Sequence, residues 1–386
     1  MIQIGNEKKG VWQNPICTDR WHSYTDGKGR KMDTVRKKYT IMTVTSMGVR
    51  ITPLSRQPVH TSSLYQMQST SAESNVLNVS ASLGKPVKAL TKFVSKSPIS
   101  AFIQGELRRR GIEFEGKAVV QEGPWGVRHQ FNIADSGYGL RGPRVHNDRA
   151  GEVGLTLRAE DFDLKRIFQE EGCQIFHLSG LVAGLSPQVG ECCLKMVEEA
   201  KKNHALVSFD LNYRASFWKG REERLRKVFH EIAQSADILI GNEEDFQLAL
   251  GAEGPKTGGE TVSKIESFQE MISRVAKEYP NVKVFATTLR QVVSANEHLW
   301  GAIMLAEGQW YVEKPREIPV LDRIGGGDGF VGGLLYGISQ GWEPGQWLKF
   351  GWGTGAMAAT LLEDYASPVS EEQVWSIYEG NARVKR

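Results

Sequence analysis

The sequence predicts an α/β protein with a mostly parallel central sheet, helices on both of its faces and a small separate β-sheet. Buried strand patterns alternate with helical patterns from about residue 160 onward, which is typical of a three-layer α/β/α sandwich. Short alternating strands separated by turns fill residues 116–145 and predict the small sheet. A glycine-rich turn at 325–327 leads into an apolar helical period, so we expect this turn to open a helix.

Composition excludes several classes of protein. The chain has 386 residues, of which 40% are hydrophobic and 24% charged, as in ordinary globular proteins. A net charge of +3 implies no strong field for nucleic acid or membranes, and no apolar run reaches the roughly 18 residues of a membrane span. The adjacent Cys192 and Cys193, with Cys17 and Cys173, fit neither a zinc spacing nor a disulfide framework. We therefore expect reduced thiols in a cytoplasmic protein.

The first part of the chain divides into an extension and the beginning of the folded domain. Residues 1–38 are polar and basic, and we expect an extension that is disordered or packed on a partner. The domain itself is predicted over 39–386. Its first elements are a strand over 39–53 and a helix over 71–84, with strands of the small sheet within about 41–70 and 116–147.

The remaining elements follow the α/β alternation. A helix ends at 106–111, and later helices are expected over 187–203 and 220–235. A hairpin at 298–312 precedes the glycine turn. After that turn, the glycines at 351, 353 and 355 indicate close helix packing rather than a phosphate loop. Buried strands are predicted over 173–178, 205–211, 236–240 and 282–288.

The turn formed by Gly325, Gly326, Gly327 and Asp328 carries the main chemical signal. Consecutive glycines let backbone N–H groups converge, and the helix dipole adds positive charge, so phosphate is the natural ligand. A carboxylate beside bound phosphate is repelled unless it accepts a proton, as an Asp commonly does in phosphoryl transfer. The alternative is a plain glycine-rich turn with a helix-capping Asp. A dinucleotide fingerprint fails, because no G-x-G-x-x-G follows a strand near the start of a βαβ unit.

The stretch 322–328, Asp-Arg-Ile-Gly-Gly-Gly-Asp, resembles the D-x-x-G-x-G-D signature of the ribokinase-like (PfkB) carbohydrate kinases. The residues of this stretch most closely resemble those of 2-keto-3-deoxygluconate kinases. The resemblance covers roughly residues 39–380 and implies a ribokinase-like sandwich with a β-sheet lid. It further implies that Gly325 to Gly327 hold the transferred phosphate and that Asp328 activates the sugar hydroxyl.

The resemblance also assigns sugar-side residues. Residues 70–77 resemble the family's G-G-A-E-x-N-x-A segment, which implicates Ser71 and Asn75, although Thr70 and Ser71 replace both glycines. A side chain there occupies space that the ligand would use. The segment 144–151 resembles V-x-Y-D-R-A-G, in which the arginine pairs with the substrate carboxylate, a task suited to a guanidinium. Arg149 matches this arginine, whereas Asn147 and Arg128 stand where the family has tyrosines. Asp364 matches the aspartate of a later G-D pair, but the glycine of that pair is missing.

Nucleotide and metal positions follow from three further motifs. F-D-x-N-x-R at 209–214 implies that Asn212 and Arg214 face the ATP phosphates, with Thr288 and Arg290 in a nucleotide-side turn. N-x-x-E, which acts near magnesium in the family, matches Asn242 and Asp245, one methylene short. The implied cofactors are ATP and Mg²⁺.

Three functions remain open at this point. The first is an ATP-dependent kinase for 2-keto-3-deoxygluconate or a related sugar acid. The second is a catalytically impaired relative that serves as a binding or scaffold protein. The third is an active kinase for a neutral sugar such as fructose or ribose. Lid strands in such kinases often pair between subunits, so a homodimer or a higher homo-oligomer through the lid is expected.

Overall fold

The computed structural model describes residues 37–254 and 265–382. The chain divides into two units, Met1–Thr34 and Val35–Arg386, and the architecture below is that of the second. The predicted extension over 1–38 lies almost wholly outside the described residues, as does Cys17. The other three cysteines are buried free thiols, as expected. Among the described residues, no helix combines the length and apolar character needed to cross a bilayer.

A nine-stranded sheet forms the middle of this unit, in the order β13-β12-β11-β10-β9-β8-β1-β4-β5. β12 is antiparallel to both of its neighbours, and all other pairs are parallel. Such a sheet needs cover on both faces, and its inner strands are accordingly buried along most of their length. The strands are β1 (Tyr39–Val44), β4 (Val87–Val94), β5 (Glu113–Val119), β8 (Cys173–Ser179), β9 (Leu206–Asp210), β10 (Ile238–Ile240), β11 (Val284–Ser294), β12 (Glu297–Ala306) and β13 (Gln309–Pro319).

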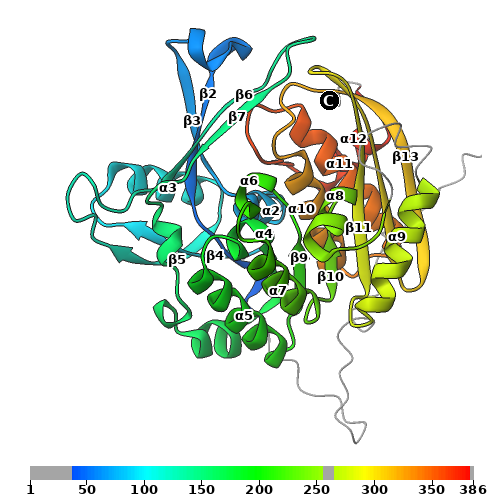
Figure 1. Cartoon of the computed structure of the whole chain (residues 1–386). Helices are drawn as coiled ribbons and strands as arrows, with labels where there is room; N and C mark the ends of the chain where they lie inside the picture. The colour runs from blue at the N-terminus through cyan, green and yellow to red at the C-terminus, as the bar shows by residue number, and fades with distance from the viewer. Residues whose placement is uncertain (1–36, 255–264, 383–386) are drawn as a thin grey trace, which may run out of the picture. The chain divides into compact units, whose positions relative to one another are not determined.

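Helices cover the two faces of this sheet and give the predicted three layers (Figure 1). One layer contains α5 (Pro187–Lys202), α7 (Glu222–Ala233), α8 (Glu243–Leu250) and α9 (Ile265–Glu278). The other contains α2 (Ala72–Ser82), α10 (Gly326–Ser339), α11 (Pro344–Ala359) and α12 (Glu371–Tyr378). The remaining helical segments are α3 (Pro98–Arg109), α4 (Gly180–Ala183), α6 (Ala215–Trp218), a π-helix (Lys165–Glu171) and short 3-10 turns at Leu54–Arg56, Val59–Thr61, Val153–Thr156 and Ala159–Asp161.

A second, four-stranded sheet, here called the lid, has the order β3-β2-β6-β7. Its strands are β2 (Gly48–Pro53), β3 (Tyr65–Thr70), β6 (Gln130–Asp135) and β7 (Arg144–Asp148), and they extend away from the helices in Figure 1. Four polar side chains stand next to one another across it, because the register pairs Gln68 with Arg50, Arg50 with Asn132, and Asn132 with Asn147. This row, Gln68-Arg50-Asn132-Asn147, lies on one face of the lid.

Two strand predictions are wrong in detail. The expected continuous strand over 39–53 is interrupted at 45–47, because the chain leaves the central sheet after β1 and enters the lid at β2. The first part of the 116–145 region does not belong to the lid, since β5 pairs with β4 in the central sheet. Alternation of apolar residues predicts a strand but does not identify its partner.

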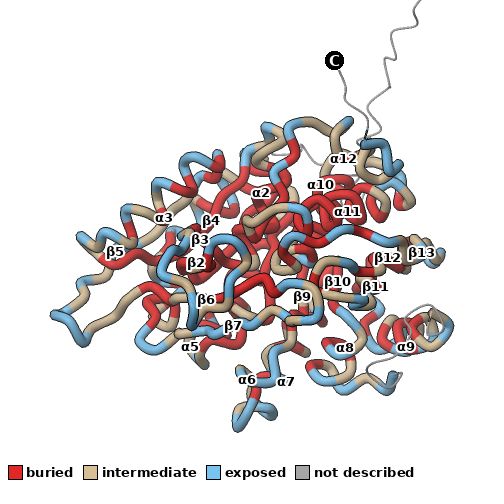
Figure 2. Tube along the Cα trace, turned by 90° about the horizontal axis from the view of Figure 1, so that it is seen from above, coloured by how far each residue is buried: buried red, intermediate tan, exposed pale blue. Residues whose placement is uncertain are grey.

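The glycines of α11 give the close helix packing that the sequence predicted, and Gly351 and Gly355 bring α11 against the start of α10. A Cβ at Gly351 would lie 2.9 Å from the Phe330 carbonyl oxygen, and one at Gly355 would lie 3.0 Å from that of Gly326. Figure 2 shows that α10 and α11 are buried over much of their length. The N-terminus of α10 is therefore held rigidly by backbone contact with α11.

Candidate active site

A cavity of about 940 Å³ opens between the lid and the ends of strands in the central sheet. Ligands bind at this edge in open α/β sheets. It brings together nearly all of the residues predicted from the sequence. Arg128 and Gly326 are the exceptions, because neither lines the cavity. The predicted residues that do line it are Ser71, Asn75, Asn147, Arg149, Asn212, Arg214, Asn242, Asp245, Thr288, Arg290, Gly325, Gly327, Asp328 and Asp364.

The glycine turn forms the N-terminus of α10, as predicted. Gly325 is the N-cap with φ 83°, a left-handed conformation that favours glycine. A Cβ there would lie 1.9 Å from the Asp364 carbonyl oxygen, so the position has no room for a side chain. At Gly327 a Cβ would meet nothing within 4 Å. Gly325 and Gly327 line the cavity, and the first N–H groups of a helix have no partner within it, so this N-terminus of a 14-residue helix is suited to bind an anion.

Asp328 lies in the first turn of α10 and is half-buried. Its Oδ2 accepts a hydrogen bond from Asn75 Nδ2 at 2.8 Å, which fixes the carboxylate toward α2. Burial raises the pKa of Asp328 to about 7, with smaller contributions from the Asp364 and Glu73 carboxylates, while the Asn75 bond and Arg214 oppose the shift. A carboxylate poised near neutral pH is suited to act as a general base.

Two further acids with raised pKa values, Asp245 and Asp210, line the same cavity. Burial raises the pKa of Asp245 to about 6, although its oxygens accept N–H bonds from Asn242 and Tyr213 at 2.7 and 2.8 Å. Burial, then the carboxylates of Asp245 and Asp328, raise the pKa of Asp210 well above its usual value. Asp210 was not assigned a role from the sequence, although it stands in the F-D-x-N-x-R motif.

Positive charge gathers on another wall of the cavity, where Arg214, Arg290 and Arg323 all line it. Burial lowers the pKa of Arg323, Asp322 opposes this shift, and the charge of Arg214 adds to it. Arginine remains protonated at neutral pH nevertheless. Asn212, at φ 40°, has a buried Oδ1 without a hydrogen-bond partner in the described part of the chain. The wall is thus suited to a polyanion, and Arg323 is a lining residue that sequence reasoning missed.

The metal positions fit a direct ion site poorly. Asn242 caps α8, since its Oδ1 accepts from the N–H groups of Glu244 and Asp245 at 2.8 and 3.0 Å. Both Asp245 oxygens are taken by backbone N–H groups. Across residues 37–254 and 265–382 there is no group of three or more His, Cys, Asp or Glu side chains placed to hold a metal ion.

The sugar-side residues of α2 and β3 have structural partners. Ser71 is the N-cap of α2 and accepts from Ser74 N at 3.0 Å. Thr70 donates to Asp364 Oδ2 at 2.7 Å. The two residues that replace the expected glycines thus cap a helix and hold a loop. Both also line the cavity.

The two arginines that the resemblance assigns to the substrate, Arg149 and Arg128, are both ion-paired. Arg149 forms a two-point contact with Glu152, through Nε at 3.0 Å and Nη2 at 2.9 Å, and Glu152 is only 1% exposed. Arg128 pairs with Asp148 outside the cavity lining. Arg149 is therefore at the predicted place, but its charge is already balanced by a buried carboxylate.

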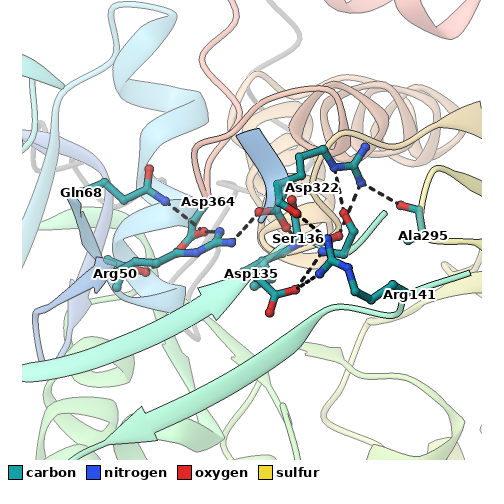
Figure 3. A network of polar contacts seen from close by, with 12 residues as sticks. Arg50, Gln68, Asp135, Ser136, Arg141, Ala295, Asp322 and Asp364 are labelled. Atoms are coloured by element: carbon teal, nitrogen blue, oxygen red, sulfur yellow. Dashed lines mark hydrogen bonds and ion pairs between the residues drawn. The ribbon is translucent and has the colours of Figure 1, made fainter. Parts of the chain in front are cut away.

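Figure 3 shows a buried ion network that the sequence did not reveal. Arg50 of β2 donates to Asp322, which precedes the glycine turn, and to Asp364, which follows α11. A basic residue in a short strand carries no local signal for partners so far along the chain. Asn132, which lines the cavity from β6, was missed for the same reason.

A three-layer sandwich with a lid, and a cavity that joins a helix N-terminus to an adjacent carboxylate, fits an enzyme that transfers a phosphoryl group. The sequence model described as pfkB family carbohydrate kinase matches residues 56–370. The chain belongs to this family, and it is a carbohydrate kinase.

The individual relatives share about 25% of their aligned residues with this chain. The chain is 25% identical to a 5-dehydro-2-deoxygluconokinase of Clostridium beijerinckii, over 86% of this chain and 88% of the relative. It is equally identical to a 2-dehydro-3-deoxygalactonokinase of Haloferax volcanii, over 88% and 96%. The structure of a 2-dehydro-3-deoxygluconokinase from Thermotoga maritima superposes with a TM-score of 0.80 at 25% identity, covering 89% of this chain and all of the other. The ribokinase-like fold is thereby confirmed.

Proposed function

We propose that the protein transfers the γ-phosphoryl group of ATP to the terminal hydroxyl of a sugar, with Asp328 as the base. The observation that carries this proposal is the Asp328 carboxylate, which lies in the first turn of α10 beside Gly325 and Gly327 in the cavity, with a pKa of about 7. A structural neighbour, a putative ribokinase II from E. coli, was solved in complex with ATP and Mg²⁺ and has a TM-score of 0.70 at 18% identity. A coupled assay over sugars with ATP and Mg²⁺ tests the activity directly.

The residues of the cavity would divide the reaction between them. Asp328 accepts the hydroxyl proton while the oxygen bonds to the γ-phosphorus and the bond from that phosphorus to the β-γ bridging oxygen breaks. The N–H groups of the glycine turn stabilise the charge of the transferring group, and Arg214, Arg290 and Arg323 bind the nucleotide phosphates. Magnesium, when bound, neutralises phosphate charge. Because Asp245 and Asn242 are engaged in capping, they would contact it through water.

The pH dependence should report on Asp328. Its carboxylate must be ionised to accept a proton, so activity is present above its pKa and lost as pH falls through that value. With the pKa at about 7, we expect kcat/KM to decline on the acid side of neutrality, about tenfold for each unit below it. A pH–rate profile between pH 5 and 9 checks this, and a flat profile down to pH 5 would contradict the assignment.

The substrate class depends on Arg149. We propose a sugar acid, as the relatives' names indicate, read by the part of the Arg149 guanidinium that Glu152 leaves open. Within the described residues, Arg149 Nη1 has no hydrogen bond or ion pair. The second candidate is a neutral sugar. It is favoured by the Arg149–Glu152 pair itself, because one guanidinium would have to serve two carboxylates.

The double substitution Arg149→Met with Glu152→Gln separates these candidates without leaving a buried charge unpaired. If Arg149 reads a carboxylate, kcat/KM for sugar acids should fall about 10- to 100-fold, the value of one charged hydrogen-bond set. Activity toward fructose or ribose should not fall. The matched control is Arg128→Met, which removes a lid-region arginine outside the cavity. Equal losses on acids and neutral sugars would remove Arg149 from substrate recognition.

The scaffold alternative finds less support. It rested on the loss of the sugar-side glycines, yet the glycine turn, Asp328 and an open cavity are all present.

The proposed homodimer has a candidate surface on the lid. There Leu64, Tyr65, Met67 and Val145 expose large apolar side chains.

A further inference from the structure

We propose that Arg50 is a positioning residue that ties the lid to the anion-binding turn and holds that turn in its catalytic geometry. This inference rests on the proposed function, but it assigns a role to a residue outside the cavity lining. Three observations carry it: the burial of the Arg50 ion network, its attachment to the turn, and its place in the polar row of the lid.

The network is fully enclosed. The side chains of Arg50 and Asp322 are 0% exposed and that of Asp364 is 1% exposed. Arg50 donates Nη2 to Asp322 Oδ2 and Nη1 to Asp364 Oδ1. Gln68 and Thr70, both from β3, add bonds of 3.2 and 2.7 Å to Asp364. Two carboxylates this deeply buried would be unstable without the guanidinium between them.

Both acids contact the glycine turn, Asp322 through its carboxylate and Asp364 through its backbone carbonyl. Asp322 Oδ1 accepts from Ile324 N at 3.0 Å, which fixes the backbone directly before Gly325. The Asp364 carbonyl oxygen packs against Gly325 so closely that a Cβ would come within 1.9 Å of it. A shift of either acid therefore moves the backbone whose N–H groups line the anion site. Figure 3 shows Arg50 reaching between these two acids.

The other end of the coupling lies in the cavity. Arg50 stands between Gln68 and Asn132 in the polar row of the lid, and Asn147 completes the row. Asn132 and Asn147 line the cavity, and Asn132 Oδ1 is buried without a partner in the described residues. A sugar that bonds to these amides would fix β6 and β7, and β6 pairs directly with β2, the strand that carries Arg50. Substrate contact on the lid and the geometry of the phosphate site are thus joined through one side chain.

The experiment compares Arg50→Met and Arg50→Lys with a matched control, Lys92→Met. Lys92 forms an ion pair of 2.6 Å with Asp161 at similar burial, 7% and 8% exposed, and neither residue lines the cavity. Loss of Lys92 should destabilise the fold in the same manner without touching the turn. Lysine at position 50 keeps the charge but lacks the planar fork that bridges both acids.

Kinase activity and amide hydrogen exchange are both measured, at a temperature well below the melting temperature of each variant. We expect kcat of Arg50→Met to fall at least about tenfold, as for a displaced catalytic geometry, with KM for ATP changed less. Arg50→Lys should lie between it and the unmodified protein. Amide hydrogen exchange over residues 322–328 should rise in both Arg50 variants and stay unchanged in Lys92→Met. In Arg50→Met the acid limb of the pH–rate profile should move to higher pH, because Asp364 loses its counter-charge and its negative charge then raises the pKa of Asp328 further. The other groups around Asp328, which are Glu73, Asp210, Asn75 and Arg214, are unchanged.

The outcomes separate the two proposals. If Arg50→Met does not fold, Arg50→Lys provides the same readouts. A kcat within twofold of the unmodified protein, or unchanged exchange in the turn, would overturn the role of Arg50. If the unmodified protein phosphorylates no sugar, the proposed function fails, whereas the exchange measurement still tests the coupling.

Discussion

Replacing Asp328 by Asn should lower kcat by about 10²- to 10⁴-fold, the range that a positioned general base contributes. The amide has nearly the same shape and can still contact Asn75, but it cannot accept the hydroxyl proton. Since the carboxylate is buried enough to raise its pKa to about 7, its removal should not cost stability. A coupled assay measures kcat, and thermal unfolding measures stability.

Binding supplies the control for this variant. ATP affinity should remain within a few-fold, because the N–H groups of α10 and the arginine wall are untouched. Calorimetric titration with a non-hydrolysable ATP analogue measures it. Turnover within threefold of the unmodified protein would remove Asp328 from the chemistry, and the glycine turn would then be a binding element alone.

Replacing Gly325 by Ala should abolish activity and also destabilise the fold. The left-handed conformation at φ 83° costs a side chain about 1–2 kcal/mol. The added Cβ would in addition collide with the Asp364 backbone at 1.9 Å. Relief of this collision must move either the turn or the Asp364 loop, so the anion site and the Arg50 network would both be disturbed.

The matched variant is Gly327→Ala, two positions further along. Its Cβ would point into open space and α10 can accommodate alanine, so the melting temperature should not fall. Turnover should fall nevertheless, because the methyl group enters the space where the phosphate is proposed to lie. Full activity of Gly327→Ala would place the anion elsewhere, and an unchanged melting temperature for Gly325→Ala would contradict the packing against Asp364.

The sequence predicted the layers and most of the cavity lining because these depend on local signals. The buried strands of the central sheet are short apolar runs, and the turn at Gly325 to Asp328 combines glycine geometry with a helical period. Residues at strand ends converge in a parallel sheet whatever its exact register. Asn212, Arg214 and Asp245 could therefore be placed together before their distances were known.

The relations that were missed join distant segments. Whether β5 pairs with β4 or with a lid strand depends on tertiary contacts that alternation does not encode. Arg50 gave no signal, because a buried arginine is explained only by its counter-charges, and both come from the last quarter of the chain.

The separation in sequence between Arg50 and its two acidic partners has a consequence for how the protein folds during synthesis. Asp322 and Asp364 follow Arg50 by 272 and 314 residues, so strand β2 leaves the ribosome long before either acid is synthesised. Until then its guanidinium has no buried counter-ion, and the hydrated state of Arg50 is favoured over enclosure. Contacts across such separations form slowly. The junction between β2 and the glycine turn should therefore be among the last parts of the nascent chain to mature, and chains that terminate before residue 364 should not complete it.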